Sequence, residues 1–227
     1  MKHSFYSKSK KERNQIQFAI GFVAFSVLLI ALYISWLTGI YLIVIIIFPI
    51  TLSIIAPFFD VPSLKKSGGL IYYSPLFVSE KPKNGVIKIH GGTLFDYVFV
   101  IDRKLNARQR KTFIMQKYLE GLLKLLEQME NNELENLKIR GTSYIINNRT
   151  AQRIGFKVVK TDFIQKLILI YNYFNVLITL SIAKGKLSFP KLNATKTFEI
   201  QCSKLLKRKA FIGNLNEKLK ITLTQKV

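Results

Sequence analysis

The longest pattern in this chain is an apolar stretch from Ile16 to Phe59 that contains no Asp, Glu, Lys or Arg. Thr38 and Gly39 interrupt the stretch near its middle and leave two apolar segments, 16–37 and 40–59. About twenty apolar residues of helix cross the hydrocarbon core of a bilayer. Each segment is long enough to do so, and the pattern predicts a transmembrane hairpin.

Prolines and turn formers mark the second half of this hairpin. Pro49 lies inside the second segment, where it removes a backbone donor, and we expect a kink there. Pro57 lies close to the end of the segment, where the helix can stop. Residues 60–69 (DVPSLKKSGG) are rich in turn formers and are interpreted as a juxtamembrane linker. A cleaved signal peptide does not fit, because a second apolar segment follows the first at once.

Basic residues flank the hairpin on both sides, and its turn carries none. These residues are Lys2, Lys8, Lys10, Lys11 and Arg13 before the first segment, and Lys65, Lys66, Lys81 and Lys83 after the second. By the positive-inside rule, both termini are predicted to face the cytoplasm of a cell with this protein in its plasma (inner) membrane. Residues 1–15 would then form a basic cytoplasmic tail.

Residues 70–193 show alternating strand and helix patterns, which predict one α/β domain. The segment Leu70–Val78 is apolar and aromatic, but Pro75 must split a strand there or confine it to an edge. The segments Val86–His90 and Thr93–Ile101 are rich in β-branched and aromatic residues. We therefore expect them to be two adjoining strands of one sheet.

A long helix follows, over Asn106–Met129, with Asn106 as its N-cap and leucines along one face. A strand over Leu137–Ile146 after this helix predicts a mixed or parallel sheet covered by helices. A short helix is predicted at 148–155, capped by Asn147 or Asn148 and stopped by Gly155. A strand follows at 156–160, and Thr161 or Asp162 can cap the next helix. The predicted fold class is a membrane-anchored α/β (α+β) protein with a two-helix hairpin and one small mixed sheet.

The segment Phe163–Ala183 is nearly long and apolar enough for a third span. In that case the basic tail from Lys184 would lie outside the membrane, against the charge rule, and Asn172 and Asn175 would lie in hydrocarbon. We therefore expect a core helix of the domain. A helix resting on the membrane is the second alternative, and a true span is the third.

Residues 187–192 are expected to form a loop, and 194–227 form a basic C-terminal region with an amphipathic helix over Lys196–Leu219. This helix either packs on its own domain or lies on anionic lipid or on a partner helix. The basic residues predicted to bind lipid or a partner are Lys65, Lys66, Lys204, Lys207, Arg208, Lys218 and Lys220.

The chain of 227 residues has a formal net charge of +22, and residues 60–227 carry most of the excess. A tethered polycation is attracted by about 1 kcal/mol per Lys or Arg near an anionic membrane surface, so we expect anionic headgroups as a partner. A coding bias that favours Lys, Ile and Asn is the alternative origin of this charge. Nucleic acid is not the expected partner, because no zinc ligands, RNP-like aromatic motif or obvious recognition helix is present.

Few residues suggest chemistry. His90 is the only histidine beyond the N-terminal tail, and Asp96 and Arg140 are the weak candidates to join it in a catalytic site. The single cysteine, Cys202, excludes an internal disulfide and a multi-cysteine metal cluster. No metal site is predicted, because two widely separated histidines and one cysteine do not make a usual zinc site. No cofactor is predicted either, since Gly91-Gly92-Thr93 lacks the spacing of a phosphate-binding loop.

Part of the chain resembles a known family. The run GVIKIHGGTLFDYVFV, then a long helix, then KIRGTSYIINNRTAQRIGFKVV and a further apolar helix, is similar to the small α/β domain called YkoP-like. That domain occurs alone and attached to bacterial polysaccharide deacetylases. The resemblance covers about residues 84–185. It implies an accessory domain connected with the bacterial envelope and brings no catalytic residues to carry over.

Three functions remain open. The leading hypothesis is a non-enzymatic bacterial membrane protein whose basic cytoplasmic domain binds a protein partner or anionic headgroups, in envelope assembly. The second is a membrane-bound enzyme or accessory protein acting on a lipid-linked or polysaccharide substrate, with a cleft at His90, Asp96 and Arg140. The third is a membrane protein that binds nucleic acid.

Overall fold

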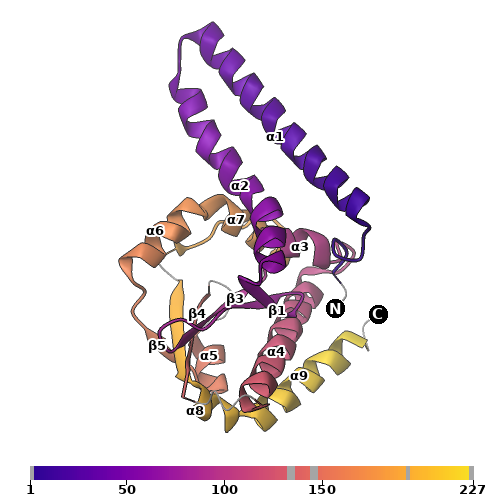
Figure 1. Ribbon diagram of the computed structural model, residues 1–227, viewed down its shortest axis with the longest axis vertical. Helices are drawn as coiled ribbons and strands as arrows, with labels where there is room; N and C mark the ends of the chain where they lie inside the picture. The colour runs from indigo at the N-terminus through magenta and orange to yellow at the C-terminus, as the bar shows by residue number, and fades with distance from the viewer. Residues whose placement is uncertain (1–2, 132–135, 144–147, 193–194, 225–227) are drawn as a thin grey trace.

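A helical hairpin projects from an α/β domain in the computed structural model, which describes residues 3–131, 136–143, 148–192 and 195–224 (Figure 1). The hairpin consists of α1 (Lys10–Thr38) and α2 (Leu42–Lys66), joined by a turn in which Gly39 has a φ of 69°. Glycine suits this left-handed conformation because it has no side chain to clash there. Both helices are long and apolar enough to cross a membrane, and most of their large apolar side chains are exposed.

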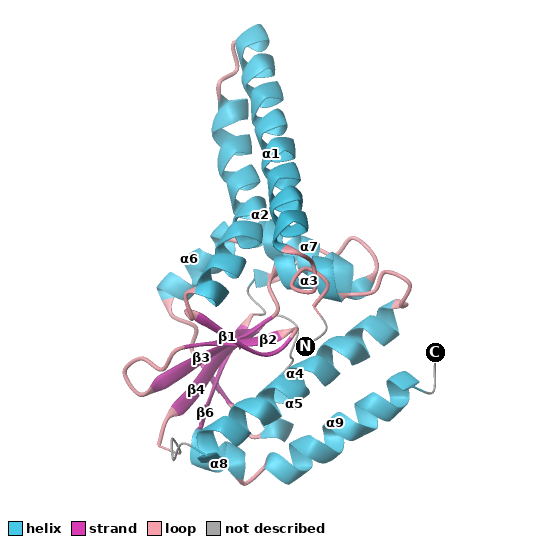
Figure 2. Cartoon of the chain, turned by 45° about the vertical axis from the view of Figure 1, so that its right-hand side comes forward, coloured by secondary structure: helices cyan, strands magenta, loops and turns pink. Residues whose placement is uncertain are grey.

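The N-terminal residues do not form a free tail. A capping box of Ser9 and Glu12 starts α1 six residues before the first apolar segment. Ahead of it, Phe5 is 2% exposed and packs against Phe95 of the domain and Val61 near the end of α2. The segment before α1 therefore contacts the domain, and both ends of the hairpin lie at the same side of it (Figure 2).

The second helix is longer than predicted, because neither Pro57 nor the stretch 60–69 ends it. It continues through Pro57 and Pro62 to Lys66, so most of the expected linker is helical. A proline in a helix leaves the carbonyl four residues earlier without its donor. Side chains from outside α2 donate to both of these carbonyls, which belong to Ser53 and Phe58. The helix continues because its lost hydrogen bonds are replaced.

A single six-stranded mixed sheet forms the centre of the domain, with the order β1-β2-β3-β4-β6-β5. The strands are β1 (Leu70–Ser74), β2 (Phe77–Glu80), β3 (Val86–Gly91), β4 (Lys138–Ser143), β5 (Lys157–Val159) and β6 (Lys196–Gln201). Pro75 lies in the turn between β1 and β2, as its position predicted. The pair β3 and β4 is parallel, and the other neighbouring strands are antiparallel.

The segment Thr93–Ile101 is a helix, α3 (Leu94–Val100), and the prediction of a strand there was wrong. Its aromatic and β-branched residues favour a strand, but Thr93 and Asp96 form a reciprocal capping box that starts a helix. The packing of Phe95 and Tyr97, which are nearly fully buried, then stabilises it. Tertiary burial has overridden the local strand preference.

The helix α4 (Ala107–Asn131) crosses from β3 to β4 over one face of the sheet, as predicted, and Asn106 accepts a hydrogen bond at its start from the backbone of Gln109. The main core lies between this helix and the sheet. Its members include Phe77, Ile87, Ile89, Leu119, Leu122, Leu126, Ile139, Phe198 and Ile200. The short helix α5 (Asn148–Ile154) precedes Gly155, whose φ of 109° ends it. Asn147 lies outside the described residues.

The segment Phe163–Ala183 is not one core helix. It forms α6 (Phe163–Tyr171) and α7 (Tyr173–Lys184), which meet at Asn172 with a bend of 70°. The side chain of Asp162 caps α6, as predicted. No residue of α6 is buried, whereas α7 buries one face. The expectation of a core helix therefore holds for α7 only.

The predicted C-terminal helix over Lys196–Leu219 is also divided. Its first residues are strand β6, which pairs with both β4 and β5. Then follow α8 (Cys202–Leu206) and α9 (Lys209–Thr224). Ile212 of α9 is fully buried, and Asn216 accepts a hydrogen bond from Gln116 of α4. Of the two alternatives, α9 therefore packs on its own domain.

Candidate functional site

The outer face of α6 is apolar and uncovered. Phe163 is 72% exposed, Ile164 69% and Ile170 59%, and Leu167, Ile168 and Tyr171 are also exposed. Figure 2 places this helix at the foot of the hairpin, beside α2 and above the end of the sheet. A large exposed apolar patch on a protein marks a surface that contacts something else, such as a partner or a membrane.

The bend between α6 and α7 is hydrogen-bonded to α2, at a point well inside the apolar segment of α2. The hydroxyl of Ser53 donates to the carbonyl of Tyr171 at 3.0 Å, and Nδ2 of Asn175 donates to the carbonyl of Ser53 at 2.8 Å. We call Tyr171–Asn175 the elbow. Because Ser53 lies six residues before Phe59, the elbow contacts α2 about 9 Å along its axis from the end of the apolar segment.

A cavity of about 380 Å³ lies between the foot of α2, the helices α6 and α7, and the sheet. We call it the hairpin-foot cavity. Its apolar wall comes mainly from α2, α6 and α7, through Pro57, Val61, Leu64, Leu169 and Val176. Its polar lining includes His90, Thr93, Thr142, Gln165, Asn172, Asn175 and Thr179. It also reaches the carboxyl ends of the parallel strands β3 and β4, which is where α/β sheets commonly bind ligands.

Two polar residues of the cavity lining differ in how they are hydrogen-bonded. Asn175 is 7% exposed, and its Oδ1 has no hydrogen-bond partner among the described residues, although its Nδ2 is fully used. His90 is half-buried, and its Nε2 lies 2.8 Å from Oε1 of Glu80. The hydrogen bond from His90 lowers the pKa of Glu80, against a smaller opposing effect of burial.

The structure does not bring His90, Asp96 and Arg140 into one site. Asp96 is fully buried, and its carboxylate accepts hydrogen bonds from Thr93, Tyr72 and His3. The guanidinium of Arg140 binds Glu199 on the neighbouring strand and, like His90, points away from the main core. Only His90 of the three candidates lines the hairpin-foot cavity.

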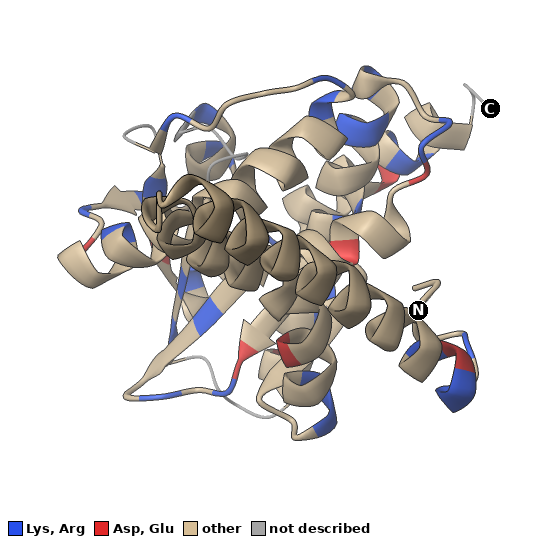
Figure 3. Cartoon of the chain, turned by 90° about the horizontal axis from the view of Figure 1, so that it is seen from above, with Lys and Arg blue, Asp and Glu red and all other residues tan. Residues whose placement is uncertain are grey.

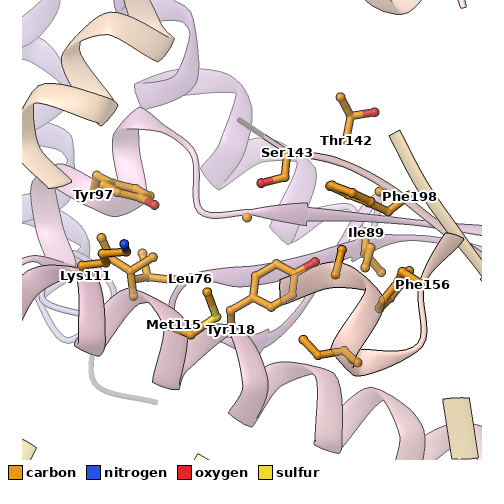
Figure 4. Close-up of a pocket in the computed structure, with 15 residues that line it drawn as sticks. Leu76, Ile89, Tyr97, Lys111, Met115, Tyr118, Thr142, Ser143, Phe156 and Phe198 are labelled. Atoms are coloured by element: carbon orange, nitrogen blue, oxygen red, sulfur yellow. The ribbon is translucent and has the colours of Figure 1, made fainter. Parts of the chain in front are cut away.

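A second, smaller cavity of about 50 Å³ lies on the opposite face of the sheet (Figure 4). Lys111, Met115 and Tyr118 reach toward it from α4, and Ile89 and Phe198 line it from the strands. Burial raises the pKa of Tyr118, so its hydroxyl stays neutral. The lining is continuous with the main core.

The basic residues predicted to bind lipid or a partner fall into two groups. Lys65 and Lys66 end α2 at the hairpin foot, and Nζ of Lys65 lies 3.4 Å from the centroid of the Tyr6 ring. The others lie on α8, on α9 and between them, and α8 is at the end of the domain away from the hairpin (Figure 1). They are Lys204, Lys207, Arg208, Lys218 and Lys220. Seen along the hairpin, Lys and Arg are spread around the domain (Figure 3).

Sequence reasoning singled out His90 but missed the polar residues that build the cavity and its walls. Asn172 and Asn175 were visible as amide side chains within an apolar segment, which is a signal for internal hydrogen bonding. Their partners could not be read from the sequence, because Ser53 and Asn175 are 122 residues apart. In the described ranges, no group of three His, Cys, Asp or Glu side chains is placed to hold a metal ion.

Comparison with family models, with curated proteins and with solved structures finds no match to this chain.

Proposed function

We propose that this chain is an integral membrane protein that holds its basic domain against the anionic cytoplasmic surface of a bacterial inner membrane. In this proposal α1 and α2 cross the bilayer, and α6 and the elbow lie in the interfacial layer beside them. The domain binds headgroups or a membrane protein partner there and serves in envelope assembly. A YkoP-like domain, as the sequence resemblance predicts, would fit this role.

The observation that carries the proposal is the bare apolar face of α6 at the foot of the hairpin. Fully burying one large apolar side chain is favourable by about 1.5–3 kcal/mol, so six such side chains in water would be costly. A helix of nine residues is only about 14 Å long, too short to cross a hydrocarbon core of about 30 Å. An amphipathic helix lying in the interface is the arrangement that fits both facts.

Charge supports the same orientation. The basic start of α1 and the basic end of α2 both lie at the domain side of the hairpin, and the turn at Gly39 has no charged residue. The positive-inside rule therefore places the domain on the cytoplasmic side. Lys65 and Lys66 are then close to the headgroups, where an anionic surface attracts them.

The depth of α6 tests this proposal. Full-length Ile164→Cys protein carries a fluorophore in nanodiscs of phosphatidylcholine with one quarter phosphatidylglycerol, and spin-labelled lipid serves as the quencher. We expect strong quenching at position 164 and little at an exposed control, Glu127→Cys on α4. Equal, weak quenching at the two positions would contradict the proposal. Cys202 is fully buried, and unsubstituted protein measures its background labelling.

The second candidate is an enzyme or enzyme accessory for a lipid-linked substrate, favoured by His90, which lines the hairpin-foot cavity and is paired with Glu80. A histidine oriented by a carboxylate can act as a general base. Full-length protein incubated with a short isoprenyl diphosphate sugar would release the sugar. The activity would be lost in His90→Ala and retained in Lys88→Ala, a neighbour on the same strand. No release by the unsubstituted protein would exclude this substrate.

A further inference from the structure

We infer that the hairpin-foot cavity binds the uncharged, hydroxyl-bearing headgroup of a membrane lipid, with a sugar or glycerol as the group recognised. This inference rests on the proposed function, because it places the cavity at the membrane surface. It goes beyond that function because it assigns the cavity to one class of lipid. The basic surface of the domain, by contrast, attracts any anionic headgroup.

The position of the cavity points to a lipid. Three of its walls are the helices that the proposed function places in or beside the bilayer, namely the foot of α2, α6 and α7. Leu169 of α6 and Pro57 and Val61 of α2 give these walls an apolar lining. A lipid can therefore keep its chains in the bilayer while its headgroup enters the cavity. The volume of about 380 Å³ is within the usual range of about 300–1,000 Å³ for small-ligand sites.

The lining favours a neutral headgroup. Among the residues that the structure describes, no Lys, Arg, Asp or Glu lines the cavity, and His90 already has Glu80 as its partner. A phosphate placed there would lose its hydration without gaining a cation, which is unfavourable. Amide and hydroxyl side chains, such as Gln165 and Asn172, form hydrogen bonds with hydroxyl groups instead.

The buried amide of Asn175 belongs to the same polar lining. Its Nδ2 donates to Ser53 and to Asn172, which fixes the orientation of the amide, and within the described part of the chain its Oδ1 has no donor. Buried polar atoms are nearly always paired. A sugar or glycerol hydroxyl can donate to amide oxygens of the lining, whereas a phosphate oxygen or an ester cannot.

Photolabelling of the full chain tests the inference. The protein is reconstituted in phosphatidylcholine nanodiscs that contain either a glucosyl diacylglycerol or a phosphatidylcholine, each with a diazirine near the headgroup. We expect the glycolipid to label the foot of α2 and the α6–α7 pair saturably, with competition by unlabelled glucosyl diacylglycerol. Gln165→Trp, which puts a large side chain at the cavity wall, should lower this labelling at least fivefold. Lys166→Trp, the adjacent exposed position outside the cavity lining, should leave it unchanged.

Four results would overturn the inference. Equal labelling by the two lipids would remove the preference for hydroxyl groups, and unchanged labelling of Gln165→Trp would remove the cavity as the site. Protection by free methyl glucoside as complete as that by the glycolipid would assign the site to a soluble sugar. Absence of any labelling of α6 by either lipid would show instead that the proposed membrane position has failed.

Discussion

The side-chain amide of Asn175 donates to the backbone carbonyl of Ser53 at 2.8 Å, across 122 residues of sequence. Pro57 is the residue whose missing N–H would otherwise bind that carbonyl within α2. The hydrogen bond therefore replaces a lost helical bond and attaches α7 to the hairpin. It also sets the orientation of the Asn175 amide, whose residue lines the hairpin-foot cavity.

This relationship predicts that removing Pro57 restores part of the stability lost when Asn175 is replaced. Asn175→Leu should lower the free energy of unfolding by about 1–3 kcal/mol, because it leaves a buried carbonyl without a donor. Pro57→Ala supplies an N–H to the same carbonyl, so the double variant should lose less than the sum of the single variants. Denaturant unfolding in mixed micelles measures the unfolding free energies of the unsubstituted protein, the two single variants and the double variant. Pro49→Ala in the same helix serves as the control and should give no rescue of Asn175→Leu.

A second proline predicts a parallel effect between the two helices of the hairpin. Nε2 of Gln17 donates to the carbonyl of Phe58 at 2.9 Å, and Pro62 has removed the helical donor of that carbonyl. Gln17→Leu should cost about 1–3 kcal/mol of unfolding free energy, and Pro62→Ala should recover part of it. The same substitution at the exposed Gln15 should have little effect. Equal losses at positions 15 and 17 would contradict this role of Gln17.

The buried carboxylate of Asp96 predicts that an isosteric change is harmful. Its two oxygens accept four hydrogen bonds, from the backbone and side chain of Thr93, from the hydroxyl of Tyr72 and from Nε2 of His3. Asp96→Asn turns one acceptor into a donor that faces other donors, at a cost of about 1–3 kcal/mol in unfolding free energy. It should also release the N-terminal segment, seen as faster trypsin cleavage after Lys8. Asp102→Asn, at an exposed position, is the matched control.

Close packing of α4 on the sheet predicts opposite effects for two glycines. A Cβ at Gly121 would lie 2.4 Å from Cβ of Phe77, so Gly121→Ala should destabilise the domain by about 1–3 kcal/mol or more. Gly213 lies within α9, where an added Cβ meets nothing within 4 Å. Gly213→Ala should therefore stabilise by about 0.5–1 kcal/mol through helix propensity. Thermal unfolding compares the two variants. A stability change of the same sign at both positions would contradict this packing.

The carboxylate of Glu120 predicts an acid-dependent part of the stability. Burial raises its pKa, but hydrogen bonds from Lys117 and Gln116 outweigh this effect and lower the pKa from 4.5 to about 2. A lowered folded-state pKa stabilises the fold above the unfolded pKa, and that contribution is lost as the pH falls from about 4.5 toward about 2. The stability difference between unsubstituted protein and Glu120→Gln should shrink over this range. Denaturant unfolding at pH 6, 4.5 and 3 measures this stability difference. Glu127→Gln is the exposed control, and its stability difference from the unsubstituted protein should stay constant.

Much of the fold could be predicted because the information is local. The two hairpin helices follow from the length and apolarity of their own segments, and α4 follows from its leucine spacing and the cap at Asn106. The segment Thr93–Ile101 was misassigned because aromatic and β-branched residues also occur in buried helices, and a short capping box decided the outcome. Strand β6 was missed because its pairing with β4 joins residues more than fifty positions apart.

The sequence by itself determined that the chain carries two helices able to span a membrane, a basic α/β domain and no evident catalytic motif. Only the tertiary structure decided that α6 leaves its apolar face bare, that His90, Asp96 and Arg140 have separate partners, and that a cavity forms at the hairpin foot. The physical reason is that hydropathy and helix capping act between near neighbours. Burial, by contrast, and the pairing of Asn175 with Ser53, depend on segments that meet only when the chain is folded.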